Sequence, residues 1–424
     1  MTVISNEAMI ERKKYLDELI SLQQNGMIKV ITGMRRCGKS YLLFTLFADY
    51  LEKRGIAPDH IIKIDLENFK NRELRNPDNL YAHIEARITD TDTYYILLDE
   101  VQLLEYFEEV LNGLLHIPNV DVYVTGSNAK FLSKDIITEF RGRGFEIKMH
   151  PLRFAEYMSV YQGSVQAGLN EYLLYGGLPQ IISYPTEELK IRFLQNLFTE
   201  TYLRDIIERY KIQKDDDLEE IINILASGVG SLTNPNKLAN TFKSNKKSEI
   251  SYDTVKGYVD YLCDSFLIEK ATRYDIKGKT YINTPFKYYF MDLGLRNARI
   301  NFRQTDRGHL MENLIYNELR IRGYNVDVGV MPVVVRNENG QQQRSQLEVD
   351  FVCNAGSRRY YIQSAYRMDT EEKMAQEKAS LLKVDDSFKK IIILGEESPV
   401  IRDENGITSI SIYDFLLKEN ALEL

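Results

Sequence analysis

The sequence contains no tryptophan, only three cysteines and no run of about 18 consecutive hydrophobic residues. Cys37, Cys263 and Cys353 lie far apart in the chain, which excludes a disulfide framework and a paired-cysteine zinc site. The missing hydrophobic run excludes a membrane-spanning helix, and residues 1–16 lack the apolar core of a signal peptide. The lack of tryptophan, beside 28 tyrosines, says little about chemistry. We therefore expect a cytoplasmic protein with no membrane contact.

A surplus of positive charge is also missing. The chain carries 54 Lys and Arg against 62 Asp and Glu, a net charge of −8, which excludes a uniformly basic nucleic-acid coat protein but not a local basic patch. Hydrophobic residues make up 44% and charged residues 27%, a composition typical of folded rather than disordered chains. The 424 residues, at roughly 100–200 per domain, predict two to four domains.

A phosphate-binding loop follows the first apolar segment. Residues 27–32 are predicted to form a buried strand, residues 33–40 match the pattern G-x-x-x-x-G-K-[ST], and helix-forming residues come next. Such a loop points backbone N–H groups at phosphate oxygens, while its lysine reaches the β- and γ-phosphates and its hydroxyl binds Mg²⁺. The residues expected to bind the nucleotide are Gly33, Met34, Arg35, Arg36, Cys37, Gly38, Lys39, Ser40 and Tyr41, although a solvated loop tip explains Arg35 and Arg36 equally well.

A second acidic element is predicted at the end of the hydrophobic segment 94–98. Asp99 and Glu100 follow this segment directly, as in a Walker B strand. Asp99 is expected to hold Mg²⁺ through water, and Glu100 to polarise the attacking water. Acidic residues exposed at a strand end are the alternative. A nucleotide binder that performs no hydrolysis would not need Glu100, so the pair favours a hydrolase.

Polar residues follow a third predicted strand, 120–124. Because ligands bind at the carboxyl ends of parallel strands, Thr125, Ser127 and Asn128 are candidates for sensing the γ-phosphate. A turn that caps the helix beginning near residue 129 is the alternative. Residues 61–66 form a further predicted strand. Strands that alternate with helices predict a doubly wound α/β domain.

These motifs resemble the AAA-type, STAND-like predicted ATPases of bacteria and archaea. The resemblance is carried by residues 33–40, 96–102, 124–128, 141–144 with 151–154, and 176–179. It implies an α/β protein in four parts. These parts are a P-loop NTPase core with a parallel sheet (1–150), a helical lid (151–215), a winged helix (216–304) and a restriction-endonuclease-like α/β domain (305–424).

The resemblance also implies roles for two residues outside the phosphate loop. Arg143 corresponds to the arginine of the family's Gly-Arg motif and would serve as an arginine finger or phosphate sensor. An arginine that solvates a strand edge is the alternative. Pro179 corresponds to the proline that packs on adenine, although Gly-Gly and Pro are also ordinary turn residues. The implied cofactors are ATP and Mg²⁺.

Residues 231–310 differ from the rest in charge. They carry fourteen Lys and Arg against eight Asp and Glu, so the remainder of the chain has a net charge of −14. Helices at 236–243 and 252–263, followed by a β-ribbon over 268–282, are typical of a winged helix that binds DNA. Thr254, Lys256 and Tyr258 are expected on or near the exposed part of the second helix, and Lys277 and Lys279 at the tip of the wing. An internal joint that never contacts DNA is the alternative.

The C-terminal part resembles the PD-(D/E)xK nuclease core. Active members hold Mg²⁺ with two carboxylates and position the attacking water with a lysine. Glu312 and Asp350 match the carboxylates, but Gln363-Ser364-Ala365 stands where the third acid and the lysine belong. We therefore predict no nuclease activity, unless Arg367 or another nearby cation replaces the lysine.

The sequence favours an Mg²⁺-dependent ATPase that acts as a conformational switch. The alternatives are an ATP-regulated DNA-binding protein and a residual Mg²⁺-dependent nuclease that uses Glu312 and Asp350. An arginine finger acting between subunits would require a homo-oligomer, whereas a STAND-like switch would be monomeric at rest.

Overall fold

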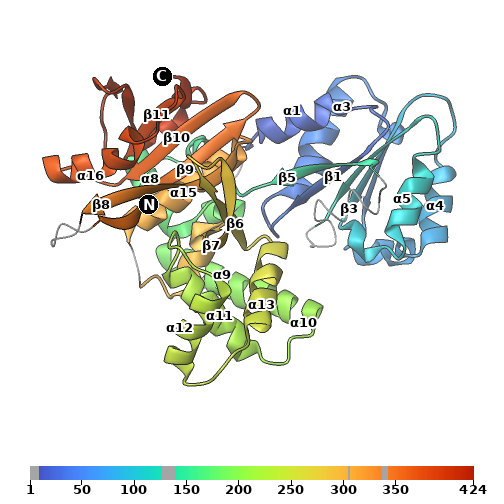
Figure 1. The fold of residues 1–424 in the computed structure, drawn as a ribbon. Helices are drawn as coiled ribbons and strands as arrows, with labels where there is room; N and C mark the ends of the chain where they lie inside the picture. The colour runs from blue at the N-terminus through green and yellow to red at the C-terminus, as the bar shows by residue number, and fades with distance from the viewer. Residues whose placement is uncertain (1–8, 127–139, 141, 304–305, 337–341) are drawn as a thin grey trace.

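The computed structural model describes residues 9–126, 140, 142–303, 306–336 and 342–424. Figure 1 shows an N-terminal unit around one sheet at the right, a second sheet that contains the C-terminal strands at the left, and a helical region below this second sheet. No helix in the described part of the chain is long and apolar enough to span a membrane.

The N-terminal unit contains a five-stranded sheet in the order β2-β3-β4-β1-β5. All neighbouring strands are parallel, which confirms the predicted α/β core. Strand β4 separates the strand that precedes the phosphate loop from the strand that ends in Asp99. The strands are β1 (Ile28–Gly33), β2 (Ile61–Asp65), β3 (Tyr94–Asp99), β4 (Val120–Thr125) and β5 (Gly144–Met149).

Helices cover both faces of this sheet, so its strands are buried on both sides. One face contacts α1 (Lys13–Ser21) and the continuous helix formed by α2 (Lys39–Tyr41), η1 (Leu42–Phe47) and α3 (Ala48–Lys53). The other face packs against α4 (Pro77–Glu85) and α5 (Phe107–Leu114). Three short helices, η2 (Pro58–His60), η3 (Phe69–Arg75) and η4 (Val101–Leu103), join these elements.

A helical segment follows β5 where a lid was predicted. It packs into the same core as the phosphate-loop helix through Phe154, Tyr172, Leu178 and Phe198. Side chains of Ser164 and Thr186 cap two of its helices. Its elements are α7 (Phe154–Met158), α8 (Val165–Tyr175), η6 (Pro179–Ser183), α9 (Glu187–Asn196), η7 (Leu197–Leu203) and α10 (Arg204–Tyr210).

The middle region contains the predicted helices and ribbon. They are α11 (Asp215–Ser227), α12 (Pro235–Lys246), α13 (Tyr252–Asp264), β6 (Ile268–Asp275), β7 (Thr280–Phe290) and α14 (Leu293–Arg299). Thr254 and Lys256 are exposed, as expected. The prediction for Tyr258 is wrong, because this side chain is 7% exposed and packs with the buried residues of α11 and α13.

The C-terminal region forms an eight-stranded sheet in the order β12-β13-β11-β10-β9-β8-β6-β7. The hairpin expected as a separate wing therefore belongs to this sheet, because β6 pairs in parallel with β8 over residues 273–275 and 328–330. The elements beyond the hairpin are α15 (Arg307–Ile321), β8 (Asn325–Arg336), β9 (Gln342–Ala355), β10 (Arg358–Ala365), α16 (Glu371–Leu382), β11 (Lys389–Leu394), β12 (Ile401–Arg402), β13 (Ile407–Ser411), α17 (Ile412–Leu417) and η8 (Ala421–Glu423).

Candidate nucleotide-binding site

The phosphate loop requires glycine at two positions. Gly33 has a φ of 136°, and a Cβ atom there would lie 2.1 Å from the carbonyl oxygen of Met149, so no side chain fits. Gly38 has a φ of 102° at the start of α2, a conformation that glycine adopts without strain. The loop can therefore turn sharply between β1 and α2 and leave its N–H groups directed inward.

Lys39 lies inside this loop. Its side chain is buried, and its ammonium donates hydrogen bonds to the carbonyl oxygens of Gly33 at 3.1 Å and Met34 at 3.0 Å. The loop thus places the positive charge of Lys39 next to its own backbone N–H groups, an arrangement that suits a phosphate ligand.

Thr125, at the carboxyl end of β4, connects the two acidic residues of the neighbouring strand. Its hydroxyl donates to Asp99 and accepts a hydrogen bond from the backbone N–H of Glu100 at 3.0 Å. Burial raises the pKa of Asp99, whereas hydrogen bonds from Thr125 and Ser40 act in the opposite direction. Ser40 and Asp99 therefore lie together, as a magnesium site requires, and a hydroxyl with a carboxylate is a donor set that suits Mg²⁺.

Glu100 follows Asp99 in a left-handed conformation with a φ of 53°. This conformation turns the chain sharply at the end of β3, and the Glu100 carboxylate accepts a hydrogen bond from the amide of Gln102. Glu100 and Gln102 both line a cavity beside Lys39 and Ser40.

This cavity has a volume of about 530 Å³, which lies in the range of small-molecule sites. The predicted nucleotide ligands Gly33, Met34 and Cys37 do not line it. The Met34 and Cys37 side chains are fully buried, and the Cys37 thiol lies 3.7 Å from the Met149 carbonyl oxygen. The lining residues are Arg35, Arg36, Gly38, Lys39, Ser40, Tyr41, Glu67, Glu100, Gln102, Leu103, Gln180 and Thr201.

The lid contacts the phosphate loop through Arg35 and Arg36. The Arg35 guanidinium pairs with Asp205 of α10 at 2.6 Å, and the Tyr202 hydroxyl donates to the Arg35 carbonyl at 2.7 Å. The Arg36 guanidinium lies 5.9 Å from the ring centroid of Phe193 on α9. Arg35 is therefore more than a solvated loop tip, because it links the loop to the lid.

Arg12 also contacts the loop, and the sequence gives no signal for it. Its side chain is buried, and its Nη2 donates to the carbonyl of His150 at 2.6 Å, while Nε pairs with Glu156 of the lid at 3.2 Å. A further hydrogen bond joins Nη1 to the carbonyl of Cys37 at 2.9 Å. A single arginine that precedes a helix follows no recognisable pattern.

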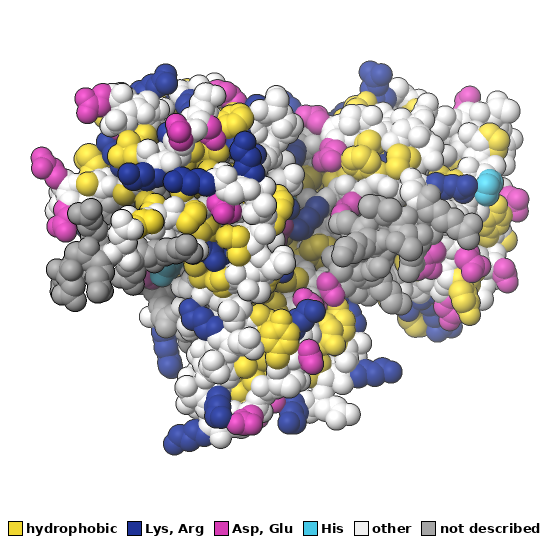
Figure 2. Space-filling view, viewed as in Figure 1, with side chains coloured by type: hydrophobic (Ala, Val, Ile, Leu, Met, Phe, Trp, Pro, Cys, Tyr) yellow, Lys and Arg dark blue, Asp and Glu magenta, His cyan; other side chains and the backbone are white. Residues whose placement is uncertain are grey.

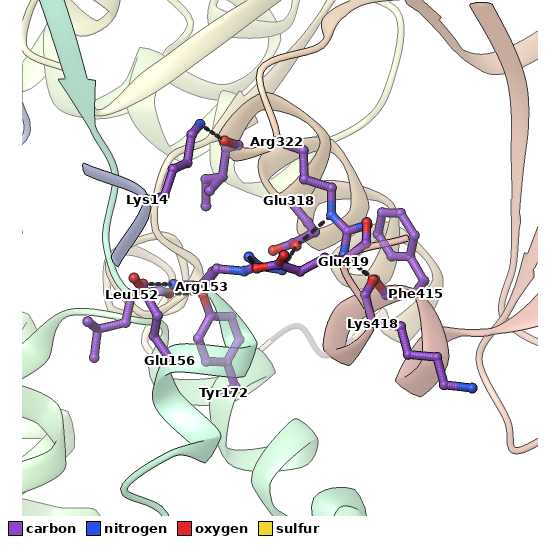
Figure 3. Close-up of polar contacts among 11 residues, drawn as sticks. Lys14, Leu152, Arg153, Glu156, Tyr172, Glu318, Arg322, Phe415, Lys418 and Glu419 are labelled. Atoms are coloured by element: carbon purple, nitrogen blue, oxygen red, sulfur yellow. Dashed lines mark hydrogen bonds and ion pairs between the residues drawn. The ribbon is translucent and has the colours of Figure 1, made fainter. Parts of the chain in front are cut away.

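A charged cluster extends from this lid segment into the C-terminal region (Figure 3). The N–H of Arg153 donates to Glu156 at 2.9 Å, and the Arg153 guanidinium pairs with Glu318 of α15 at 2.8 Å. Glu318, only 1% exposed, also pairs with Arg322 at 2.8 Å, whose guanidinium donates to carbonyls at the end of α17. The lid and the C-terminal region are thus joined by a buried carboxylate between two arginines.

Pro179 lies close to the phosphate loop. Its Cγ atom is 4.0 Å from the position that a Cβ atom would take on Gly38, and the next residue, Gln180, lines the cavity. Gly177 fixes this turn, because its N–H donates to Asp292 and its carbonyl accepts from Leu152, both at 2.8 Å. Pro179 is therefore near the loop but does not itself line the cavity.

Asp99 does not line the cavity itself but is hydrogen-bonded to Ser40, which does, and two other predicted site residues are not placed at the cavity either. Arg143 is exposed and pairs through its carbonyl with the N–H of Ile28, at the start of β1. Lys39 follows the carboxyl end of β1, whereas Arg143 lies beside the amino end. The six residues of β1, at about 3.3 Å each, separate these two ends by about 20 Å. Ser127, like Asn128, lies outside the described residues.

Comparisons with known proteins agree with this geometry. A family model described as an AAA domain matches residues 25–158, and two described as domains of unknown function, DUF8612 and DUF4143, match residues 166–306 and 307–415. A solved Walker-type ATPase of Pyrococcus abyssi superposes with a TM-score of 0.51 at 14% identity, over 71% of this chain and 98% of its own. That likeness supports a P-loop NTPase fold.

Two curated relatives match nearly the whole chain. An uncharacterized protein of Methanocaldococcus jannaschii is 28% identical over 443 residues, covering 100% of this chain and 92% of its own length. An uncharacterized protein of Haemophilus influenzae is 34% identical over 422 residues, covering 97% of this chain and 100% of its own length. The chain therefore belongs to the family of AAA-domain proteins that includes this Haemophilus relative.

Proposed function

We propose that the protein binds ATP with Mg²⁺ in the cavity beside Lys39 and hydrolyses it. The observation that carries this proposal is the Thr125 hydroxyl, which is hydrogen-bonded both to Asp99 and to the backbone of Glu100. A binding site alone needs no fixed acid beyond the metal carboxylate. Here the second acid is held at the cavity wall, where a general base for water belongs.

The residues divide into two roles. Lys39 and the loop N–H groups would bind the β- and γ-phosphates, while Ser40 and Asp99 would hold Mg²⁺, which neutralises phosphate charge when bound. Glu100 would accept a proton from the attacking water, and Gln102 would orient the Glu100 carboxylate through their hydrogen bond.

The same site would act as a conformational switch. Arg35 lines the cavity and pairs with Asp205 of the lid, so a triphosphate that attracts the guanidinium competes with this pair. ATP binding would thereby change how the lid sits on the loop, and hydrolysis would reverse the change.

Phosphate release by the purified protein tests the proposal. We expect Lys39→Ala to abolish turnover in the presence of Mg²⁺ and ATP, and Glu100→Gln to abolish turnover while ATP binding remains. Lys53→Ala, which removes an exposed lysine in the same domain, is the matched control and should leave turnover unchanged. Equal phosphate release by all three variants would show that the activity belongs to another site or a contaminant.

DNA binding is a second candidate, supported by exposed lysines of the middle region. Lys277 and Lys279 lie in the turn between β6 and β7, and Lys246 and Lys247 lie at the end of α12. Figure 2 shows blue lysine and arginine side chains on the lower part of the molecule, where Figure 1 labels α11, α12 and α13. Such side chains would bind phosphates without reading sequence.

Duplex DNA binding measured across salt concentrations, with and without ATP, tests this candidate. Weaker binding at higher salt, and a smaller salt slope for Lys277→Glu with Lys279→Glu, would support it. Binding that ignores salt, or none at low ionic strength, would exclude it.

We also propose that a catalytic role for Arg143 requires a second copy of the chain. The residue lies at the far edge of its own sheet, so its guanidinium would have to reach a neighbour's cavity. Light scattering with and without ATP tests for such a homo-oligomer. A monomer with unchanged turnover at every concentration would rule the role out.

A further inference from the structure

Three carboxylates of the C-terminal region converge on one buried point. Glu312 comes from α15, while Glu348 and Asp350 come from the same face of β9. Glu312 and Asp350 are both buried, and Glu348 is one-third exposed. Glu312 and Asp350 are the two acids predicted to hold a nuclease metal, and Glu348 is a third acid beside them.

The point at which they converge is taken by the ammonium of Lys287. Its Nζ lies 2.8 Å from Glu312, 2.7 Å from Glu348 and 3.9 Å from Asp350. Burial opposes the charge, but the carboxylates of Glu312, Asp350 and Glu348 outweigh burial and raise the pKa of Lys287. At these distances the Lys287 ammonium occupies the place of the site's cation.

A divalent metal ion does not fit beside this ammonium. Mg²⁺ binds carboxylate oxygens at about 2.0–2.1 Å and keeps several water ligands. An ion bound by the two oxygens that contact Lys287, Glu312 Oε1 and Glu348 Oε1, would have to occupy the space of Nζ, which lies 2.8 Å and 2.7 Å from them. Two of the carboxylate oxygens have further donors, since Glu312 Oε1 also accepts from Tyr289 at 2.6 Å and Asp350 Oδ2 accepts from the N–H of Ser364 at 2.8 Å.

Lys287 and the three carboxylates come from different parts of the chain. Lys287 lies on β7, within residues 166–306, whereas its three partners lie within residues 307–415, so the contact joins two separately matched domains. Gln363, which replaces an acid in the nuclease pattern, is neutral and hydrogen-bonds to Glu377 at 3.3 Å.

We propose that the chain's own Lys287 fills the acidic site of the C-terminal domain in place of a divalent metal ion. Through the Lys287 ammonium, this acidic site binds β7 of the middle region. The site then anchors β7, an edge strand of the eight-stranded sheet, to β9 and α15 rather than serving as a metal-dependent nuclease centre. The ligand of the site is a primary ammonium supplied in cis.

Titration calorimetry tests the proposal by measuring how many Mn²⁺ ions the full chain binds at pH 8 in the absence of nucleotide. We expect the unmodified protein and its Asp350→Asn variant to bind Mn²⁺ identically, since the ammonium keeps metal out. Lys287→Met, which preserves length but removes the charge, should gain a single additional Mn²⁺ ion per chain, and the double variant with Asp350→Asn should lose that ion again.

The proposal remains testable if Lys287→Met does not fold. Mn²⁺ binding by the unmodified protein that Asp350→Asn removes would overturn it directly, with no change at Lys287 needed. Lys287→Arg, which retains a cation, should fold and gain no metal ion. A folded Lys287→Met protein that gains no Mn²⁺ ion would also overturn it.

Discussion

Arg12 donates a hydrogen bond across 2.9 Å to the carbonyl oxygen of Cys37, a residue in the middle of the phosphate loop. The same guanidinium bonds to His150 at the end of β5 and pairs with Glu156 of the lid. A planar, permanently charged group thus fixes the loop, the sheet and the lid in one arrangement. The orientation of the loop carbonyls decides which way its N–H groups face, so Arg12 helps to preorganise the phosphate site.

Arg12→Lys should weaken nucleotide binding while the protein stays folded. Lysine keeps the charge but cannot direct several donors at fixed angles, so the loop loses a constraint. We expect ATP affinity to fall about tenfold, or about 1.4 kcal/mol, measured by calorimetry with a non-hydrolysable ATP analogue. Lys13→Ala, at the exposed neighbouring position, is the control. Unchanged affinity in Arg12→Lys would show that the loop holds its shape without the arginine.

Thr125→Val should reduce ATP hydrolysis much more than ATP binding. The change removes the hydroxyl that bonds to Asp99 and to the N–H of Glu100, but leaves Lys39 and the loop intact. We expect a fall in kcat of about 10²-fold with an unchanged Kd for ATP, as for loss of an oriented general base.

The matched control for Thr125→Val is Thr32→Val. Thr32 is also buried on this sheet and also donates to a carboxylate, that of Glu146 at 2.6 Å, but this carboxylate is neither of the two acids that Thr125 contacts. Both variants should lose about 1–3 kcal/mol of unfolding free energy, because each removes one hydrogen-bond donor from a carboxylate. Only Thr125→Val should lower kcat, and an equal loss in both variants would count against a positioning role for Thr125.

The sequence predicted the residues whose types and spacing are fixed by chemistry. Lys39, Ser40, Asp99 and Glu100 stand at one edge of the sheet because parallel strands share their carboxyl ends, and that rule needs no coordinates.

Arg12, Asp205 and Lys287 could not be predicted, because each acts through a partner more than 20 positions away and none belongs to a pattern. Tyr258 was misplaced because helical spacing does not reveal which face a neighbouring helix will cover. The assignment of β6 and β7 to the C-terminal sheet depends equally on long-range pairing.

Glu318→Gln should destabilise the protein strongly. Its carboxylate is the shared partner of Arg153 and Arg322 in a buried site, and a neutral amide removes the buried counter-charge of both guanidinium groups (Figure 3). Breaking such a pair costs about 3–5 kcal/mol, measurable as a shift in urea denaturation. Glu419→Gln is the control, since Glu419 also faces Arg153, at 3.8 Å, but is 90% exposed. It should change the unfolding free energy by less than about 1 kcal/mol, and similar losses in both variants would contradict a special role for the buried carboxylate.

His150 should make the folded state sensitive to mild acid. Burial, together with the nearby charge of Lys148, lowers the pKa of this side chain to about 3, whereas an unfolded histidine titrates near about 6.5. Below pH 6.5 the unfolded chain therefore binds a proton that the folded chain does not, so the unfolding free energy falls as the pH falls. One such proton changes the unfolding free energy by at most about 1.4 kcal/mol per pH unit.

Urea denaturation at pH 7.5 and pH 5.5 measures this contribution when His150→Gln is compared with the unmodified protein. Glutamine does not titrate, so the variant should lose about 1 kcal/mol less on acidification than the unmodified protein does. His116→Gln, a change at an exposed position, should retain the full loss. Because the comparison takes the difference between two proteins at each pH, the titration of the many other acidic groups cancels. Equal losses in the unmodified protein and His150→Gln would mean that His150 is protonated in the folded protein at pH 5.5.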